Sequence, residues 1–377
     1  MATKDRKVRV LVGTRKGGYV VESDTKRRKW AVKGPFHEGG DVYHLVADPR
    51  SPGDLYAAVN NGYFGPRLFR SANWGKNWKE LAPPMMPVLS KRGPPTGDPV
   101  EQAKRPIINL WHIEPGPASE PGTVFLGIDP ASLFRSDDKG RSWTAVPGLN
   151  EHETRPTWNP GAGGMCLHSI LIDPTNPRRM YVGISAAGVF RTDDGGDHWK
   201  PLNRGVRVSF LPEKEPVVGQ CVHKIAFEPS DPNTLYRQDH DGIYVSHDSA
   251  EKWTRVGRPL PSDFGFVVTA PPARPREAYF VPLEGRARTT PGGALQIYRW
   301  QDTSREWTPM IKGRPFVGEL GTHREGLASD HLDPPGIYLG TTTGQLVYSA
   351  DAGKRWAEVP YRFPGIHSVA VSSPISM

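Results

Sequence analysis

Short apolar runs alternate with clusters of turn residues along the whole chain. Between 165 and 200, apolar positions gather in the runs 165–172, 180–184 and 188–192, and Gly, Pro, Asp and Asn separate these runs. Runs of this length bounded by turn residues are typical of β-strands. No stretch shows the 3.6-residue apolar periodicity of an amphipathic helix over a convincing length. The chain is therefore expected to be an all-β protein with many short strands.

An eight-residue pattern, Ser/Thr-x-Asp-x-Gly-x-x-Trp, recurs among these runs, and we call each copy a box. The copies lie about 50 residues apart, a spacing typical of propellers and solenoids, in which no single unit buries its apolar face alone. Clean boxes end at Trp143, Trp199 and Trp356, boxes with one change end at Trp78 and Trp253, and eroded boxes end at Trp30 and Trp307.

Each repeat contains four strands, with its box in the turn between the third and the fourth. We predict a seven-bladed β-propeller of four-stranded blades, with six or eight blades as the alternatives. The N- and C-terminal segments are expected to pair and close the ring, which removes exposed strand edges. The chain, 1–377, then forms a single domain with blades at 6–36 plus 364–377, 42–82, 108–147, 165–202, 220–258, 264–311 and 325–361.

Every residue of a box has a structural explanation. The Asp carboxylate accepts hydrogen bonds from turn N–H groups, and the Gly supplies a positive φ. The Trp ring packs between neighbouring sheets, where it buries a large apolar area. We therefore assign no catalytic role to the box aspartates.

The boxes resemble the Asp-boxes, or BNR repeats, of the sialidase-like β-propeller superfamily. The resemblance covers essentially the whole chain, which looks like bacterial proteins labelled BNR-repeat glycosyl hydrolases. In true sialidases it would imply an arginine triad, an early Arg-Ile-Pro motif and a Tyr-Glu nucleophile pair. The sequence before the first good box contains no Arg-Ile-Pro, and no sialidase catalytic residue is carried over. Other members are assembly factors or sorting receptors, so the resemblance leaves a non-enzymatic function open.

Composition narrows the classes of partner. The net charge of +8 comes from scattered basic pairs, without the basic stripe and interleaved aromatic residues that nucleic-acid binding needs. Such a surface favours small anionic molecules through its long-range field. Two cysteines do not make a disulfide framework. The first residues lack an apolar signal core and no run approaches about 18 apolar residues, so a cytoplasmic protein that binds no membrane is expected.

The extra length of the chain predicts where a site lies. In a propeller, the loops from a fourth strand to the next first strand share one face with the turns between second and third strands, and the boxes lie on the other face. Long insertions on one face are typical of functional loops. The longest connections all fall on this first face, at 83–107, 146–164, 201–219 and 281–294.

Three histidines head predicted inner strands, in Asp41-Val-Tyr-His44, Met165-Cys-Leu-His168 and Gln220-Cys-Val-His223. Inner strands line the central channel, so we expect His44, His168 and His223 to converge at its mouth. Converging neutral imidazoles are a common setting for a divalent transition metal. A metal-free polar pocket and a purely structural role, in which each His bonds the backbone of the next blade, are the alternatives.

Other residues of the same face complete the predicted site. Glu284, Glu325 and Asp239 are candidate general bases if burial raises their pKa values. An Arg in the 146–164 insertion has the geometry to clamp a carboxylate or phosphate. The candidate ligand-binding residues are Arg155, Trp158, Gln220, His240, Arg324 and His112.

The sequence thus predicts a pocket at the channel mouth that holds a small polar or anionic molecule. Hydrolysis or lyase chemistry, assisted by a metal or not, is the expected activity. The alternative is a non-enzymatic binding or assembly protein whose rim loops hold a protein partner. No phosphate-binding loop, Gly-x-Ser-x-Gly elbow or His-Glu-x-x-His motif is present, and the sequence does not identify a substrate.

Overall fold

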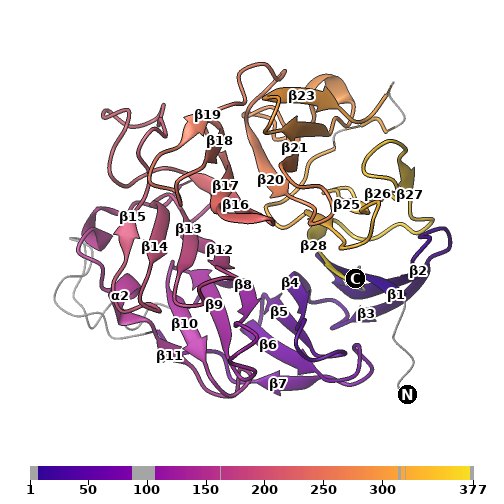
Figure 1. The fold of residues 1–377 in the computed structure, drawn as a ribbon. Helices are drawn as coiled ribbons and strands as arrows, with labels where there is room; N and C mark the ends of the chain where they lie inside the picture. Colours follow the sequence, from indigo (N-terminus) through magenta and orange to yellow (C-terminus); the bar gives the residue numbers. More distant parts are fainter. Residues whose placement is uncertain (1–6, 87–106, 162, 313–315, 319, 374–377) are drawn as a thin grey trace.

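The computed structural model describes residues 7–86, 107–161, 163–312, 316–318 and 320–373. These residues form seven four-stranded antiparallel sheets arranged around a ring (Figure 1). The fold is therefore a seven-bladed β-propeller, and the sequence prediction of the fold class is confirmed. Most of the predicted 83–107 insertion, residues 87–106, lies outside the described residues. No helix in the described part is long and apolar enough to cross a membrane.

We number the blades along the ring from the one that holds the N-terminal strand, and give their strands from the inside outward. Blade 1 consists of β28 (Ile366–Ser372), β1 (Lys7–Thr14), β2 (Gly17–Asp24) and β3 (Ala31–Phe36). Blade 2 consists of β4 (Asp41–Ala47), β5 (Leu55–Asn61), β6 (Gly65–Ser71) and β7 (Lys79–Leu81). Blade 3 consists of β8 (Asn109–Pro115), β9 (Val124–Asp129), β10 (Leu133–Ser136) and β11 (Thr144–Ala145).

Blades 4 to 7 repeat this order. In the described part of the chain, three short helices lie in the connections: α2 (Pro147–Asn150), η1 (Arg155–Thr157) and η2 (Pro291–Gly293). Blade 4 consists of β12 (Cys166–Ile172), β13 (Met180–Ser185), β14 (Gly188–Thr192) and β15 (Lys200–Pro201). Blade 5 consists of β16 (Val222–Glu228), β17 (Asp231–Asp239), β18 (Gly242–Ser246) and β19 (Thr254–Arg255). Blade 6 consists of β20 (Gly265–Thr269), β21 (Glu277–Pro282), β22 (Tyr298–Gln301) and β23 (Glu306–Pro309). Blade 7 consists of β24 (Leu327–Ser329), β25 (Ile337–Gly340), β26 (Leu346–Ser349) and β27 (Ala357–Glu358).

The two ends of the chain close the ring in blade 1. The C-terminal β28 pairs antiparallel with the N-terminal β1, with Val12 opposite Val369 and Leu11 opposite Ala370. Val12 and Val369 are both buried in an apolar cluster that blade 1 shares with blade 7. The predicted pairing of the terminal segments is confirmed, and it leaves β1 with a partner on each side.

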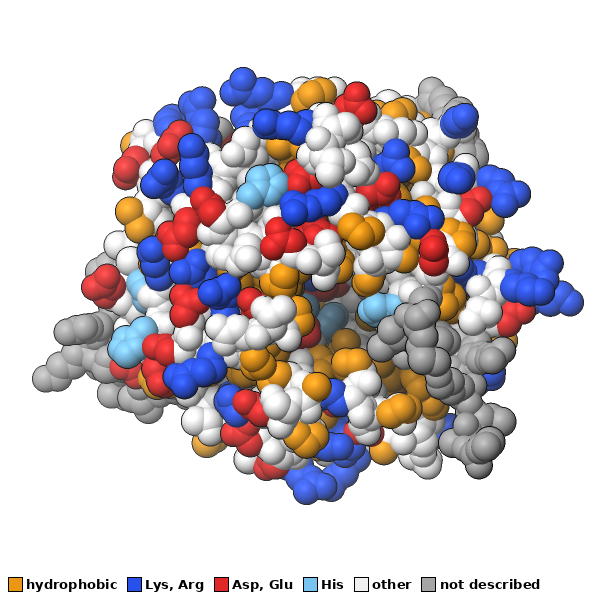
Figure 2. Space-filling view, viewed as in Figure 1, with side chains coloured by type: hydrophobic (Ala, Val, Ile, Leu, Met, Phe, Trp, Pro, Cys, Tyr) orange, Lys and Arg blue, Asp and Glu red, His pale blue; other side chains and the backbone are white. Residues whose placement is uncertain are grey.

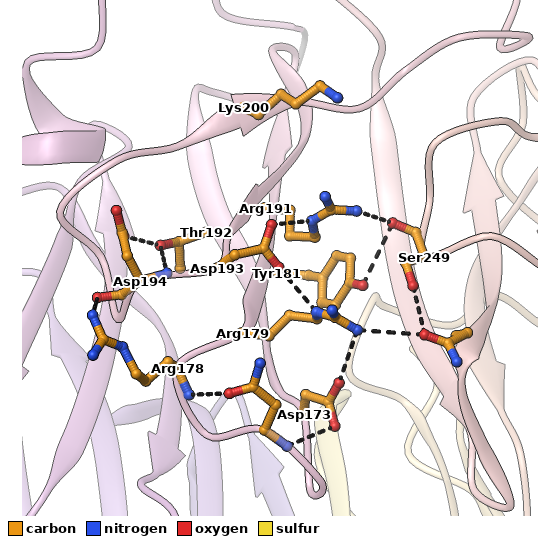
Figure 3. Close-up of polar contacts among 12 residues, drawn as sticks. Asp173, Arg178, Arg179, Tyr181, Arg191, Thr192, Asp193, Asp194, Lys200 and Ser249 are labelled. Carbon is orange, nitrogen blue, oxygen red and sulfur yellow. Dashed lines mark hydrogen bonds and ion pairs between the residues drawn. The ribbon is translucent and has the colours of Figure 1, made fainter.

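The boxes fix the turns between third and fourth strands. In the box of blade 4, the Thr192 hydroxyl donates a hydrogen bond to the Asp194 carboxylate at 2.7 Å (Figure 3). The same hydroxyl accepts a hydrogen bond from the Gly196 N–H at 3.0 Å, and the Asp194 carboxylate accepts one from the His198 N–H at 3.0 Å. Figure 3 also shows Arg191 reaching the Ser249 carbonyl of blade 5, at 2.8 Å. The predicted structural role of the box is confirmed, and the box turns also join neighbouring blades.

The box tryptophans pack between blades as predicted. Trp253 of blade 5 is 2% exposed and lies in an apolar cluster with Val189 and Leu202 of blade 4. Its indole N–H donates to the Leu202 carbonyl at 2.9 Å, so its one polar group is satisfied. The apolar core is therefore distributed between successive sheets around the ring, and it leaves the inner strands free to present polar side chains to the channel.

Candidate functional site

The inner strands carry an irregularity that positions the site. Six of them have a β-bulge near the head, where the inner strand has one residue more than the second strand. In β20, Phe266 and Val267 together face one position of β21. A bulge re-aims side chains relative to a regular strand and often lies beside a functional site. In the other five bulges the extra residue has an aromatic or imidazole side chain: Tyr43, Trp111, His168, His223 and His367.

These registers correct the equivalence that we inferred between the three strand-heading histidines. His168 and His223 are the extra residues of their bulges, whereas His44 follows the extra residue of its own bulge. His44 is thus equivalent to His112 and to Lys224. A shift of one position sends a side chain in a different direction, so the imidazoles separate into two groups.

The first group surrounds Glu325, which precedes β24. The Lys224 ammonium lies 2.6 Å from Oε1 and 2.5 Å from Oε2 of this carboxylate. His112 Nδ1 lies 3.0 Å from Oε1, and its Nε2 lies 3.2 Å from the Glu114 carboxylate. The His44 ring stacks on His112 with ring centres 4.6 Å apart. Four blades therefore contribute to one charged cluster.

The electrostatics of this cluster set its protonation. Burial alone would raise the pKa of Glu325, but Lys224 and His112 hold it well below its usual range. Burial alone would lower the pKa of His112, but the Glu325 carboxylate raises it. Burial lowers the pKa of His44 to about 3. The cluster thus contains an ionised carboxylate paired with an ammonium group, and His44 is neutral.

The second group of histidines, His223 and His240, lines a cavity of about 240 Å³. Its wall is built from strand heads, inter-blade loops and turns between second and third strands, which is the face on which the sequence placed the site. Figure 2 shows the ring face on, with a hollow at its centre in which histidine side chains are visible. The cavity is lined by Gly161, Gly163, Ser185, Ala186, Phe210, Cys221, His223, His240, Phe264, Phe266, Arg288 and Arg324.

Aromatic rings and guanidinium groups dominate this lining. The Arg324 guanidinium lies over the ring of Trp111 at 5.5 Å and over the ring of Phe266 at 5.3 Å. The Arg288 guanidinium also lies over the Phe266 ring, at 5.9 Å. Among the described residues that line the cavity, none is a carboxylate. The cavity therefore combines apolar ring faces with positive charge.

A thiol and two imidazoles meet at one side of the cavity. The ligand atoms of Cys221, His223 and His240 all lie within 4.8 Å of one another. His223 Nε2 lies 3.5 Å from the Cys221 sulfur, and its Nδ1 lies 2.6 Å from the Gly265 carbonyl oxygen. Since a carbonyl only accepts, Nδ1 carries the proton and Nε2 presents its lone pair to the sulfur. Both cysteines of the chain are free.

The structure does not bring the three predicted metal ligands together. His223 belongs to the cavity cluster, and His44 belongs with His112 and Glu325. His168 is fully buried, donates from Nε2 to the Val222 carbonyl at 2.9 Å and contacts the Ser169 hydroxyl through Nδ1 at 3.0 Å. Both nitrogens of His168 are therefore used within the fold.

The three predicted general bases have different surroundings. Glu284 is exposed on the loop between β21 and β22. Asp239 is buried in an ion pair with Arg237, whose Nε lies 2.9 Å from Oδ2, and burial raises the pKa of this carboxyl despite the arginine. Glu325 lies in the charged cluster described above. Of the three, Asp239 and Glu325 are each next in sequence to a residue that lines the cavity, and Glu284 is not.

Some of the six predicted ligand-binding residues lie at or next to the cavity, and the others do not. His240 and Arg324 line the cavity, and His112 lies in the adjoining charged cluster. Arg155 is buried against the Trp158 ring at 5.1 Å, and neither residue lines the cavity. The Gln220 amide nitrogen donates to the Pro216 carbonyl at 2.5 Å within its own loop.

Sequence reasoning missed several residues of the site. Phe264, Phe266 and Arg288 line the cavity, and an aromatic pair at the head of a predicted inner strand was the available signal. Asp129 was also missed. It is 7% exposed at the end of β9, beside the loop that contains Gly163 and Gly164, and burial raises its pKa to about 6. A carboxyl of this kind exchanges protons near neutral pH.

Comparisons with known proteins point to carbohydrate-active propellers. No protein-family model matches the chain. An oligoxyloglucan-reducing end-specific xyloglucanase of Emericella nidulans is 23% identical over 274 residues, which are 62% of this chain and 32% of that protein. A xyloglucanase of a Paenibacillus species is 29% identical over 282 residues, which are 66% of this chain and 25% of that protein. The chain thus spans about a quarter to a third of the length of these curated relatives.

Solved structures share the fold at lower identity. The GH74 xyloglucanase from Xanthomonas campestris superposes with a TM-score of 0.56 at 17% identity, covering 85% of this chain and 45% of that chain. YCF48 from Cyanidioschyzon merolae superposes with a TM-score of 0.51 at 12% identity, covering 88% of this chain and 94% of that chain. The chain is thus a seven-bladed β-propeller that is similar in sequence to xyloglucanases, which are glycoside hydrolases.

Proposed function

We propose that this propeller binds an anionic carbohydrate, such as a sugar acid or an acidic oligosaccharide, in the cavity at the channel mouth. The observation that carries the proposal is the cavity wall, which pairs aromatic rings with Arg288 and Arg324 and contains no carboxylate among its described residues. Aromatic faces pack against the apolar faces of sugar rings, and a guanidinium group binds a carboxylate with two parallel hydrogen bonds. The similarity to xyloglucanases supports the carbohydrate part of the proposal.

Arg324 is the central binding residue in this proposal. Its guanidinium is held between Trp111 and Phe266, so little conformational freedom is lost when it grips an anion. Among the described residues, its one hydrogen bond is a long one, 3.5 Å, to the Ser185 hydroxyl. The donors of this guanidinium are thus largely available to a ligand.

Hydrolysis of a glycosidic bond is the reaction that we propose for the site. Asp129 lies next to Gly164, in the loop that contributes Gly163 to the cavity wall, and burial raises its pKa to about 6. A carboxyl group with a raised pKa is the general acid that glycosidases use. In this proposal Asp129 protonates the leaving oxygen, and the water that adds to the anomeric carbon returns a proton to the Asp129 carboxylate.

Calorimetric titration tests the binding proposal. Galacturonate and its oligomers should bind, and a neutral xyloglucan oligosaccharide should bind at least tenfold more weakly, because a charge-assisted hydrogen bond is worth about 1.5–3 kcal/mol. Arg324→Gln should weaken binding of the acidic sugar by about tenfold or more. The matched control is Arg286→Gln, which changes an exposed arginine of the Arg288 loop outside the cavity lining. Equal affinity for the neutral sugar, or an unaffected Arg324→Gln variant, contradicts the proposal.

Release of reducing sugar from an acidic oligosaccharide tests the reaction. Asp129→Asn should lower kcat by about 100-fold or more with a small change in KM, because an amide donates no proton to a leaving group. Wild-type protein that binds the oligosaccharide and never cleaves it would leave a binding protein and overturn the hydrolase assignment.

A second candidate function is a platform for a protein partner. Tyr63 and Phe64, at the turn between β5 and β6, are 95% and 73% exposed on the same face as the cavity. Exposed aromatic pairs are enriched at protein interfaces. Loss of a co-purifying partner in a Tyr63→Ser, Phe64→Ser variant, with sugar binding unchanged, would support the platform.

The five good boxes support placement in the sialidase-like superfamily, and we propose that placement for the family. Their hydrogen-bonded turns are on the face opposite the cavity. Sialidase activity is not part of the proposal, since the chain has no Arg-Ile-Pro motif.

A further inference from the structure

We propose that Cys221, His223 and His240 bind a divalent transition metal ion, with zinc as the best match, at the side of the channel-mouth cavity. The three side chains offer one sulfur and two nitrogen ligands within 4.8 Å of one another. Zinc sites with three protein ligands keep a fourth position open for water or substrate. Since all three residues line the cavity, the open position would face its interior.

The spacing of the ligand atoms matches a tetrahedral ion. With Zn–S of about 2.3 Å and Zn–N of about 2.0–2.1 Å, a tetrahedral site separates its sulfur and nitrogen ligands by about 3.6 Å. The Cys221 sulfur and His223 Nε2 are 3.5 Å apart. This pair therefore needs little rearrangement to chelate the ion.

The His223 ring is already held in the orientation of a ligand. Its Nδ1–H donates to the Gly265 carbonyl at 2.6 Å, which leaves the Nε2 lone pair directed toward the sulfur. Metal-binding histidines almost always anchor their second nitrogen in this way, on a carbonyl or a carboxylate. The anchor comes from the head of β20, one blade further round the ring.

His240 has ring nitrogens with no hydrogen-bond partner among the described residues. Its ring makes edge contacts with Phe210 at 5.5 Å and Phe264 at 5.2 Å, and its backbone N–H donates to the Cys221 carbonyl at 3.0 Å. That backbone bond fixes His240 beside Cys221, and the aromatic contacts leave the imidazole nitrogens available. Such a side chain is poised to accept a metal.

The other imidazole cluster of the channel does not offer the same opportunity. His44, His112 and Glu325 also lie within 4.8 Å of one another. The Lys224 ammonium, however, contacts both oxygens of Glu325, so the place of a cation is taken by a side chain. The positive charge of the Lys224 ammonium would repel a metal ion placed at Glu325.

The donor set selects the kind of metal. Thiolate and imidazole ligands suit zinc, and also cobalt, nickel or copper, whereas magnesium and calcium require oxygen ligands. Binding would displace the Cys221 proton, so the affinity is expected to rise with pH. Arg288 and Arg324 beside the site would favour an anion at the open position.

Metal analysis of untagged protein tests the proposal, in the absence of any sugar. We expect about one equivalent of zinc per chain, and a cobalt-loaded protein with the near-ultraviolet absorption of a cobalt–thiolate bond. Cys221→Ser should abolish that absorption and lower zinc affinity at least tenfold, and His240→Ala should lower the affinity to a similar extent. His240 is partly exposed, so its variant is the one least expected to disturb folding.

Two controls match these variants. Cys166→Ser changes the other buried cysteine, and His198→Ala changes a side chain that is 90% exposed; both should keep the metal. Zinc affinity weaker than about 10 µM, cobalt bound without a thiolate band, or equal loss in Cys166→Ser would overturn the proposal. Because no sugar is used, failure of the metal site and failure of the sugar-binding proposal are separate results.

Discussion

Lys224 divides the channel into two chemically distinct parts. Its ammonium neutralises Glu325 on the channel side, and the preceding residue, His223, faces the cavity with Cys221. Two adjacent residues, His223 and Lys224, therefore belong to different clusters: His223 to the proposed metal site and Lys224 to the ionised cluster around Glu325. At the scale of single residues, the direction of each side chain depends on whether it is the extra residue of its bulge or the residue that follows.

Asp129 gives a prediction for stability as a function of pH. Its pKa is raised from 3.8 to about 6 in the folded protein, so the folded state binds the proton more tightly than the unfolded state. The contribution of Asp129 to the free energy of unfolding is then greatest below about pH 4. It falls as the pH rises through about 6, by about 3 kcal/mol in total. Asp129→Asn should remove this loss, as measured by urea unfolding at pH 4.5 and 7.5, both approximate choices that bracket the transition.

A second carboxyl provides the comparison for that experiment. The pKa of Glu22 is lowered to about 2, mainly by hydrogen bonds from Lys33 and Arg9 that outweigh its burial. The stabilisation that ionised Glu22 provides is present above about pH 4.5 and is lost only in acid. Between the two pH values, the free energy of unfolding of Glu22→Gln should therefore change as much as that of the wild type. If Asp129→Asn and the wild type lost stability in parallel, the assignment to Asp129 would be wrong.

The box is the element that sets each blade's outer turn. In the box of blade 3, the Asp138 carboxylate accepts hydrogen bonds from the Ser142 hydroxyl and backbone, and these lower its pKa to about 2. The glycine of the box takes a positive φ, +82° at Gly140. Blade 5 places Ala250 at the same point with φ of +69°. The turn thus tolerates a methyl group at a cost in backbone strain.

Gly140→Ala should therefore fold and be less stable than the wild type by about 1–2 kcal/mol, the cost of a left-handed conformation in a residue with a Cβ atom. The new Cβ would also lie 3.0 Å from Leu81 Cδ1, which must move. Urea unfolding measures the loss. The control is Gly39→Ala, where φ is +80° and nothing lies within 4 Å of the added atom.

The difference between these two variants isolates the contact with Leu81. Gly39→Ala reports the backbone term alone, so Gly140→Ala should lose more. An unchanged or increased stability of Gly140→Ala would show that the box does not need its glycine.

At the scale of the whole molecule, stability depends on closing the ring. β28 is the inner strand of blade 1, and Ile366 and Val369 are buried against residues of blade 7 and of β1. Without this strand, β1 would expose an unpaired edge, which promotes association with other chains. The ring therefore joins residues from the two ends of the sequence into one cooperative unit.

Removal of residues 366–377 should abolish the single cooperative thermal transition and cause self-association, measured by calorimetry and light scattering. Removal of 374–377 alone is the control, because it leaves β28 intact, and it should behave as the wild type. A monomeric protein with an unchanged transition after the longer deletion would contradict the role of closure.

The sequence by itself determined the number of blades, the closing pair of strands and the face that is opposite the boxes, where we propose the site. These follow from local patterns: each box lies within eight residues and marks one turn, and the spacing of the boxes repeats. The alternation of apolar runs gave the strands, and the long connections identified the face opposite the boxes.

Only the tertiary structure decided which side chains meet. A bulge adds one residue to a ladder and leaves no mark in the sequence, so His44 seemed equivalent to His168 and His223 when it is in fact equivalent to His112 and Lys224. The contacts also join distant segments, since Glu325 lies 101 residues from Lys224 and 213 from His112. The cavity, its aromatic wall and the raised pKa of Asp129 arise from burial between blades, which no local pattern records.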